Sequence, residues 1–300
     1  MPSTANKQQP ACTVCSCNRL FNEKTLHPLV SVIDLSHPCG QPQLTLDSYA
    51  IMLSSFPHDE FHGGRLACDF ADFQLSMHAP EKTIAIDCEL RHYRQGRLLL
   101  FHKDLFAATP QAKSIQAYGF LHYNNHESLH LSASEAAIIL QEMTDIAREL
   151  QWGVDQYSAK LLSGKIFTLL DYTLRFYHRQ FITRHDAGVQ SLDGINQLID
   201  AYLLAPSDTP KSLPCACKLS AKLGLSAAYF KDLVCFESGK EYAGYLQLRR
   251  LELARQLLAE GHLSNEEIAC RLGFDSTECF ERVLEKATGH AAIRCRHIKN

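Results

Sequence analysis

Two stretches of the sequence share one pattern, LSAKLGLSAAYFKDL at residues 219–233 and IACRLGFDSTECFERV at residues 268–283. Each begins with a short apolar helix that ends in Leu-Gly and one further apolar residue. A glycine here lets the backbone leave the first helix in a left-handed conformation, and the serine that follows can cap a second helix. This is the helix-turn-helix pattern, in which the second helix can enter a DNA major groove.

The pairing of the two units makes the prediction specific. A single match of this kind has many false positives, whereas two matches joined by a predicted helix at residues 242–259 are far more specific. A linker with two prolines and small polar residues precedes them at residues 205–212. The sequence therefore predicts an all-α domain at residues 213–300 that carries two helix-turn-helix units.

Further motifs agree with this domain: LSAAYF at 225–230, GK at 239–240, YLQLRRLELA at 245–254, EIACRLGF at 267–274, FER at 280–282 and Gly289. On these motifs the segment resembles the DNA-binding domain of the AraC/XylS family of bacterial transcription regulators. The resemblance implies that the partner is double-stranded DNA, with the second helix of each unit in one of two successive major grooves.

Carried over motif by motif, the resemblance implies DNA-contacting positions on both second helices. They are Ala228, Lys231 and Asp232 in the first unit and Ser276, Thr277, Glu278, Glu281 and Arg282 in the second. Lys231 and Arg282 have the chemistry to contact phosphate or guanine. Arg249 and Arg250 begin the bridging helix, whose counterpart in the family holds the two units about one DNA turn apart. Alternatively, they belong to a solvated face or form salt bridges within the domain.

The predicted DNA-facing surface is acidic. Glu278, Glu281 and Glu285 stand three and four residues apart and therefore share one helical face. Carboxylates repel phosphate, although a glutamate can accept a hydrogen bond from cytosine N4. Net charge helps little, because residues 206–300 hold 14 Lys and Arg against 12 Asp and Glu, a balance of +2. The alternative is a protein-interaction regulator whose degenerate helix-turn-helix domain binds DNA weakly or not at all.

The upstream sequence predicts an α+β arrangement. Residues 28–131 have the strand and turn spacing of a β-barrel or sandwich, with strands at 29–35, 49–53, 66–70, 82–86 and 97–101. Residues 132–204 have helical periodicity, with helices at 132–150 and about 155–181. These two helices pack on each other or on a second copy of the chain. Residues 1–27 are polar and are predicted to be mobile.

Two upstream motifs, HPLVSVID at residues 27–34 and RFYHRQFITR at residues 175–184, resemble the N-terminal domain of a Bacteroidetes-type branch of the same family. This resemblance implies a cupin-like β-barrel at residues 28–131 that senses a small-molecule effector or mediates dimerisation. The expected partners are therefore double-stranded DNA, an effector, a second copy of the chain and RNA polymerase.

Cysteine and histidine clusters suggest weaker alternatives. The Cys-x-x-Cys-x-Cys motif at residues 12–17 suits a soft metal ion, but no second ligand pair follows at zinc-finger distance. The Cys-x-Cys motif at residues 215–217 adjoins the first unit, where oxidation could perturb DNA docking and where two thiols are the simpler interpretation. The histidines at 58–62 and 122–130 lack the His-x-His of a metal cupin. We expect no catalytic residue, metal or cofactor, and a metal-dependent enzyme is the third interpretation.

Composition is that of an ordinary globular chain, with 46% hydrophobic and 21% charged residues in a length of 300 that accommodates two domains. The sequence has no run of eighteen apolar residues, so no membrane span is expected. Residues 1–10 lack the apolar core of a signal peptide. The expected location is the cytoplasm.

Overall fold

The computed structural model describes residues 11–36, 43–55, 63–85, 96–107, 109, 114–188, 191–205 and 212–288. The chain divides into two compact units, Met1–Ala187 and Gly188–Asn300, which we call the N-terminal and C-terminal units. Within the described ranges, no helix is long and apolar enough to cross a membrane.

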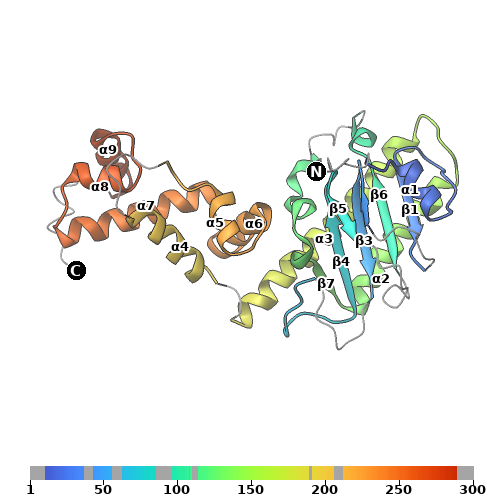
Figure 1. Ribbon diagram of the computed structural model, residues 1–300, viewed down its shortest axis with the longest axis horizontal. Helices are drawn as coiled ribbons and strands as arrows, with labels where there is room; N and C mark the ends of the chain where they lie inside the picture. The colour runs from blue at the N-terminus through green and yellow to red at the C-terminus, as the bar shows by residue number, and fades with distance from the viewer. Residues whose placement is uncertain are drawn as a thin grey trace, which may run out of the picture. The chain divides into compact units, whose positions relative to one another are not determined.

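An antiparallel sheet forms the centre of the N-terminal unit (Figure 1). Its five strands lie in the order β1-β6-β3-β4-β7, where β1 is Val30–Asp34, β3 Tyr49–Ser54, β4 Phe73–His78, β6 Arg97–Phe101 and β7 Leu129–Leu131. A separate two-stranded sheet pairs β2 (Gln43–Thr45) with β5 (Thr83–Ala85). The α+β class is confirmed. The cupin-like β-barrel is not, because the described strands form these two open sheets and no closed barrel.

The helices of this unit cover the two faces of the larger sheet. They are α1 (Val14–Leu20), α2 (Ala133–Leu150) and α3 (Ser158–Asp186), with short 3-10 turns between residues 103 and 127. On one face Phe101 contacts Phe106, which contacts Phe167 of α3. On the other face, apolar side chains from β1, β3 and β6 join α1 and the two-stranded sheet in a buried cluster. The predicted helices are therefore confirmed, and α2 and α3 pack on each other within one chain.

Helix α1 lies in the segment that we predicted to be mobile. The Thr13 hydroxyl accepts a hydrogen bond from the Ser16 N–H and caps the helix. Val14, Cys17 and Phe21 are buried against β1 and the two-stranded sheet. The prediction differs from the structure because three apolar residues in a short polar stretch give too weak a periodicity to identify a helix of seven residues. The predicted soft-metal motif falls here, and its third cysteine is a core residue.

The predicted strand at residues 66–70 is wrong. The Asp69 N–H donates to the Leu66 carbonyl at 3.0 Å, and the Asp69 carboxylate accepts from the Leu66 N–H at 2.8 Å, so the segment is a turn. The same carboxylate pairs with Arg184 of α3 through contacts of 3.1 and 2.7 Å, and both side chains are buried. Gly64, in the preceding turn, has a φ of +74°, and a Cβ there would lie 1.7 Å from the His126 carbonyl oxygen.

Side chains of helix α3 also form hydrogen bonds with backbone groups on the outer edge of strand β7. The Gln180 side-chain oxygen accepts from the His130 N–H at 2.8 Å, and Arg179 donates to the His130 carbonyl at 2.7 Å. The Tyr177 hydroxyl donates to the Glu127 carbonyl at 3.1 Å. An edge strand otherwise presents unpaired backbone groups that invite another strand. These side chains therefore fasten the helix to the sheet at the edge where barrel closure would have required another strand.

A strip of buried polar side chains lies next to the apolar cluster that contains α1, on the same face of the five-stranded sheet. Gln74, Ser76 and His78 of β4 and His130 of β7 are all buried, and Ser76 and His78 share a hydrogen bond of 3.1 Å. Burial lowers the pKa of His78 to about 4, with a smaller contribution from Lys82, and burial also lowers that of His130. Both imidazoles are therefore neutral at pH 7, which makes this unit sensitive to acid.

We expect the stability of the N-terminal unit to fall with pH because His78 becomes protonated. Its folded pKa of about 4 lies below the unfolded value of 6.5, so its contribution is complete above pH 6.5 and is lost as the pH falls toward 4. At pH 5 the loss is about 2 kcal/mol. His78→Gln should remove that part of the difference between pH 7.5 and pH 5, measured by hydrogen exchange of β4 peptides in increasing urea. The exposed His178→Gln is the control; an equal pH dependence in both variants would contradict the assignment.

The C-terminal unit is helical in the residues that the structure describes. Its helices are α4 (Asp193–Leu204), α5 (Ala216–Lys222), α6 (Ala227–Ser238), α7 (Tyr242–Glu260), α8 (Asn265–Arg271) and α9 (Thr277–Thr288). We predicted α4 as part of the helical segment at residues 132–204, whereas it packs in this unit against α7. Ion pairing between Asp200 and Arg249 and a hydrogen bond from Tyr245 to Asn196 hold it there. Most of the predicted linker, residues 206–211, lies outside the described residues.

Candidate nucleic-acid interface

The first helix-turn-helix consists of α5, a tight turn and α6. Gly224 has a φ of +69°, the left-handed conformation that ends a helix without a steric penalty only at glycine. The Leu225 N–H donates back to the Ser220 carbonyl at 2.9 Å and closes the turn. The Ser226 hydroxyl accepts from the Tyr229 N–H at 3.1 Å and caps α6. The predicted roles of the glycine and the serine are confirmed.

The second helix-turn-helix, α8 to α9, repeats this geometry. Gly273 has a φ of +73°, and the Phe274 N–H donates to the Ala269 carbonyl at 2.9 Å. The Ser276 hydroxyl accepts from the Cys279 N–H at 3.1 Å and caps α9. The backbone hydrogen bond therefore spans five residues in both turns, and the two units have the same local fold.

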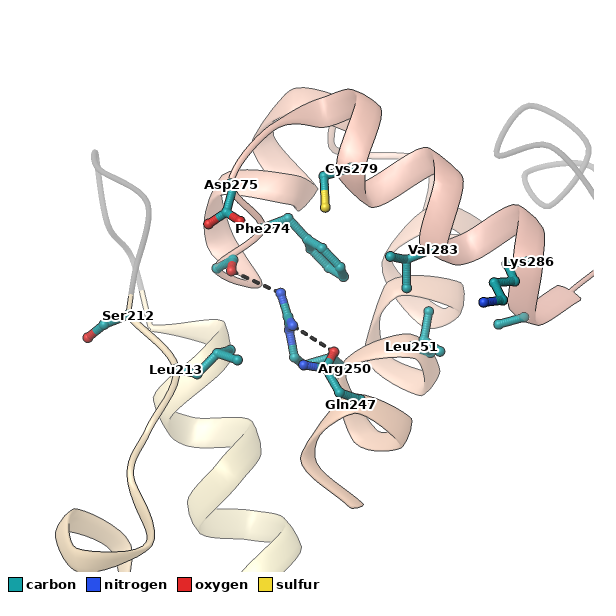
Figure 2. Close-up of a pocket in the computed structure, with 12 residues that line it drawn as sticks. Ser212, Leu213, Gln247, Arg250, Leu251, Phe274, Asp275, Cys279, Val283 and Lys286 are labelled. Atoms are coloured by element: carbon teal, nitrogen blue, oxygen red, sulfur yellow. Dashed lines mark hydrogen bonds between the residues drawn. The ribbon is translucent and has the colours of Figure 1, made fainter. Parts of the chain in front are cut away.

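Helix α7 connects the two helix-turn-helix units of the C-terminal unit. Arg250 of α7 fixes the turn of the second one (Figure 2). The buried Arg250 guanidinium donates to the Leu272 and Gly273 carbonyls at 2.9 Å each and to the Gln247 side-chain oxygen at 2.7 Å. Its Cζ lies 3.8 Å from the centre of the Phe274 ring. Arg250 thus ties the end of α8 to α7, and the direction in which α9 leaves the turn depends on it.

A match to a known family agrees with this geometry. A family model described as a helix-turn-helix domain matches residues 219–297. The segment that holds both turns is therefore similar to a helix-turn-helix family. The match includes both turns and all of α7. No curated protein sequence matches this chain.

Solved structures similar to this chain include AraC-type regulators. The C-terminal domain of AraT, a response regulator from Geobacillus stearothermophilus, has 25% identity and a TM-score of 0.29, over 36% of this chain and 88% of that one. An AraC-type transcriptional regulator from Chromobacterium violaceum has 19% identity and a TM-score of 0.31, over 38% and 94%. Wild-type ToxT from Vibrio cholerae with a bound unsaturated fatty acid has 14% identity and a TM-score of 0.29, over 88% and 92%.

The candidate DNA-contacting residues of α6 share one helical face. Ala228, Lys231 and Asp232 stand three and four positions apart. Lys231 is exposed, while Ala228 and Asp232 are partly exposed. The exposed Cys235 lies one turn further along. This face therefore presents one cation to solvent.

The candidate residues of α9 also lie on the accessible side of their helix. Ser276, Glu278, Glu281 and Arg282 are exposed, and Thr277 is partly exposed. Phe280 and Leu284, on the opposite side, are buried. The structure therefore places these positions on two second helices of matching geometry.

The acidic character of α9 is partly explained by contacts within the domain. The Glu281 carboxylate accepts from the Asn265 side-chain N–H at 2.8 Å. A hydrogen bond from the Ser276 hydroxyl lowers the pKa of Glu278, and a backbone N–H adds to this effect. Even so, Asp275, Glu278, Glu281 and Glu285 are exposed beside two cations, Arg282 and Lys286. Carboxylates outnumber cations on this surface.

Arg249 has a role within the domain. Its guanidinium donates to Asp200 of α4 at 2.8 Å and to Glu252 at 2.8 Å, and these carboxylates raise its pKa. Among the interpretations given for this residue, salt bridges within the domain therefore describe Arg249. Sequence reasoning missed its partner Asp200, although the apolar spacing of Ile195, Ile199 and Leu203 indicated a helix with one buried face.

A cavity of about 670 Å³ lies between α7, the second turn and α9 (Figure 2). Arg250, Phe274, Cys279, Val283 and Lys286 are among its lining residues. The cavity borders Arg250, so water can reach the neighbourhood of the hydrogen bonds that fix the turn. Among the described residues, no group of three or more His, Cys, Asp or Glu side chains could hold a metal ion here or elsewhere.

Proposed function

We propose that this chain is a transcription regulator of the AraC/XylS type that places α6 and α9 in successive major grooves of double-stranded DNA. The observation that carries the proposal is the repeated geometry of two capped helix-turn-helix units joined by one helix, in a segment that matches the family model. Two second helices linked by a rigid helix are suited to paired sites about one helical turn apart. The cytoplasmic location and the absence of catalytic chemistry belong to this proposal.

The N-terminal unit is proposed to sense a small-molecule effector or to mediate dimerisation. Leu161, Leu174 and Ile182 are exposed along α3, and exposed apolar side chains are available for contact with a second copy of the chain. A homodimer would present two C-terminal units to DNA and to RNA polymerase. Sedimentation of the full chain at micromolar concentration tests this part; a monomer under those conditions would exclude it.

The DNA proposal predicts that single alanine variants weaken binding. Lys231→Ala and Arg282→Ala should each lower affinity for a cognate promoter fragment about tenfold, because each removes a cation from a proposed recognition helix. Removing a residue that contacts phosphate should also reduce the steepness with which affinity falls as salt rises. Fluorescence anisotropy at several salt concentrations measures both effects.

Arg255→Ala is the matched control, because Arg255 is exposed on α7 outside both second helices. Equal affinity of all three variants and the parent chain would contradict the docking assignment. A parent chain that binds no DNA, or binds with an affinity independent of salt, would instead favour the alternative. That alternative is a protein-interaction regulator with a degenerate helix-turn-helix domain, and the excess of carboxylates on α9 is the observation in its favour.

A further inference from the structure

The lead-in to the first helix-turn-helix contains a pair of cysteines that the proposed function does not use. Cys215 and Cys217 are joined by a disulfide with a sequence separation of two. Both residues are exposed to solvent. Cys215 is the N-cap residue of α5, and Cys217 lies in its first turn.

This disulfide is not needed to hold the segment in place. The Tyr202 hydroxyl of α4 donates to the Ser212 carbonyl at 3.0 Å, and the Tyr242 hydroxyl of α7 donates to the Pro214 carbonyl at 2.6 Å. A crosslink stabilises a fold mainly by closing a long loop of the unfolded chain, and a loop of three residues gives the smallest effect. Exposed disulfides of this kind are typically the labile ones, whereas structural disulfides resist reduction.

We propose that Cys215 and Cys217 form a reversible dithiol–disulfide couple that exchanges with low-molecular-weight thiols and disulfides. In the oxidising direction, one cysteine thiolate attacks the S–S bond of a small disulfide RSSR, forms a mixed disulfide and releases RS⁻. The second thiolate attacks the protein sulfur of that mixed disulfide, forms the Cys215–Cys217 bond and releases a second RS⁻. The two protons from the cysteines end on two RSH molecules, and two electrons pass to the small disulfide.

The position of the couple connects it to DNA binding, a consequence that rests on the proposed function. The disulfide fixes the N-cap and the first turn of α5, and α5 packs directly against α6, which carries Lys231. Reduction releases that restraint on the first turn of α5, while the Tyr202 and Tyr242 hydrogen bonds still hold the residues before Cys215. Ordering this turn then becomes part of the cost of binding. The oxidised chain is therefore the form with higher DNA affinity, by about fivefold.

The chemical half of the proposal is tested without DNA. The full chain is equilibrated in glutathione buffers of graded ratio, its thiols are trapped with an alkylating agent, and the peptide that contains Cys215 and Cys217 is quantified by mass spectrometry. We expect a two-electron transition from a doubly alkylated peptide to one that is 2 Da lighter than the dithiol form. A pair that stays reduced throughout, or that forms bonds to other cysteines instead, would overturn the proposal.

The regulatory half is tested by DNA affinity in the fully oxidised and fully reduced buffers. The parent chain should bind about fivefold more weakly after reduction. Cys215→Ser combined with Cys217→Ser should abolish this difference, whereas Cys68→Ser, which removes a partly exposed thiol from the N-terminal unit, should preserve it. Unchanged affinity of the parent chain would overturn the regulatory half. If no form of the chain binds DNA, both the proposed function and the regulatory half of this proposal are overturned. The mass measurement would still decide whether Cys215 and Cys217 form a reversible couple.

Discussion

Replacing Asp69 with asparagine is expected to lower the free energy of unfolding of the N-terminal unit by about 4 kcal/mol. Asp69 and Arg184 are both buried and are joined by two hydrogen bonds that link the turn after Gly64 to the end of α3. The asparagine keeps the size of the side chain but removes the charge that balances the buried guanidinium. Hydrogen exchange of α3 and β7 peptides in increasing urea measures the effect on this unit alone.

An exposed ion pair provides the control for Asp69. Asp145 pairs with Arg148 at 2.8 Å on the surface of α2, and Asp145→Asn should cost far less stability than Asp69→Asn, because solvent screens this pair. Adding Arg184→Met to Asp69→Asn should restore part of the stability, because no unbalanced charge is then buried. A loss at Asp69 no larger than that at Asp145 would contradict a structural role for the buried pair.

The helix-turn-helix units could be predicted because their signals are local. Gly224 and Gly273 need a positive φ, Ser226 and Ser276 cap the next helix, and each of these requirements is satisfied within a few residues of sequence. Local signals of this kind do not depend on the rest of the fold. Helix α2, predicted from its helical periodicity, carries a local signal of the same kind, because Ser132 and Glu135 form a capping box.

The N-terminal unit was less predictable because its polar residues are used in long-range contacts. Strand β4 carries Gln74, Ser76 and His78 on a face that is buried against the rest of the unit. A strand with one polar face resembles a half-exposed strand in sequence. The segment with Asp69 was interpreted as a strand because its apolar residues are obvious, whereas its partner Arg184 lies 115 residues away.

The helices and turns of the candidate site could be predicted from the sequence, but its charged side chains and their partners could be predicted only in part. The spacing of Glu278 and Glu281 predicted an acidic face, and both are exposed. Their partners Ser276 and Asn265 follow from cap geometry and from the way α8 meets α9, which sequence spacing does not specify. Arg249 and Arg250 are adjacent in sequence but point to different partners, because successive positions on a helix lie about 100° apart.

Arg250 makes the side-chain contacts that hold the turn of the second helix-turn-helix. Its three hydrogen bonds go to two backbone carbonyls and one amide oxygen, so its charge is compensated by dipoles and by the Phe274 ring. Burial lowers its pKa, and the nearby Cys279 and Asp275 oppose that shift. A guanidinium is required because only its fork can reach both carbonyls at the end of α8. The second turn is thus held from α7, not by its own sequence alone.

Arg250→Met is therefore expected to lower the free energy of unfolding of the C-terminal unit by about 3 kcal/mol, because two carbonyls lose a charged donor. The released α9 should also lower DNA affinity about tenfold, since its direction is no longer fixed before binding. Hydrogen exchange of α8 and α9 peptides and anisotropy with promoter DNA measure the two effects. Arg249→Met, which breaks contacts at the partly exposed Asp200 and Glu252, should cost about 1 kcal/mol and leave α9 protected. Equal exchange of α9 in both variants would show that Arg250 does not set the direction of this helix, and the DNA proposal would then need another source for its fixed spacing.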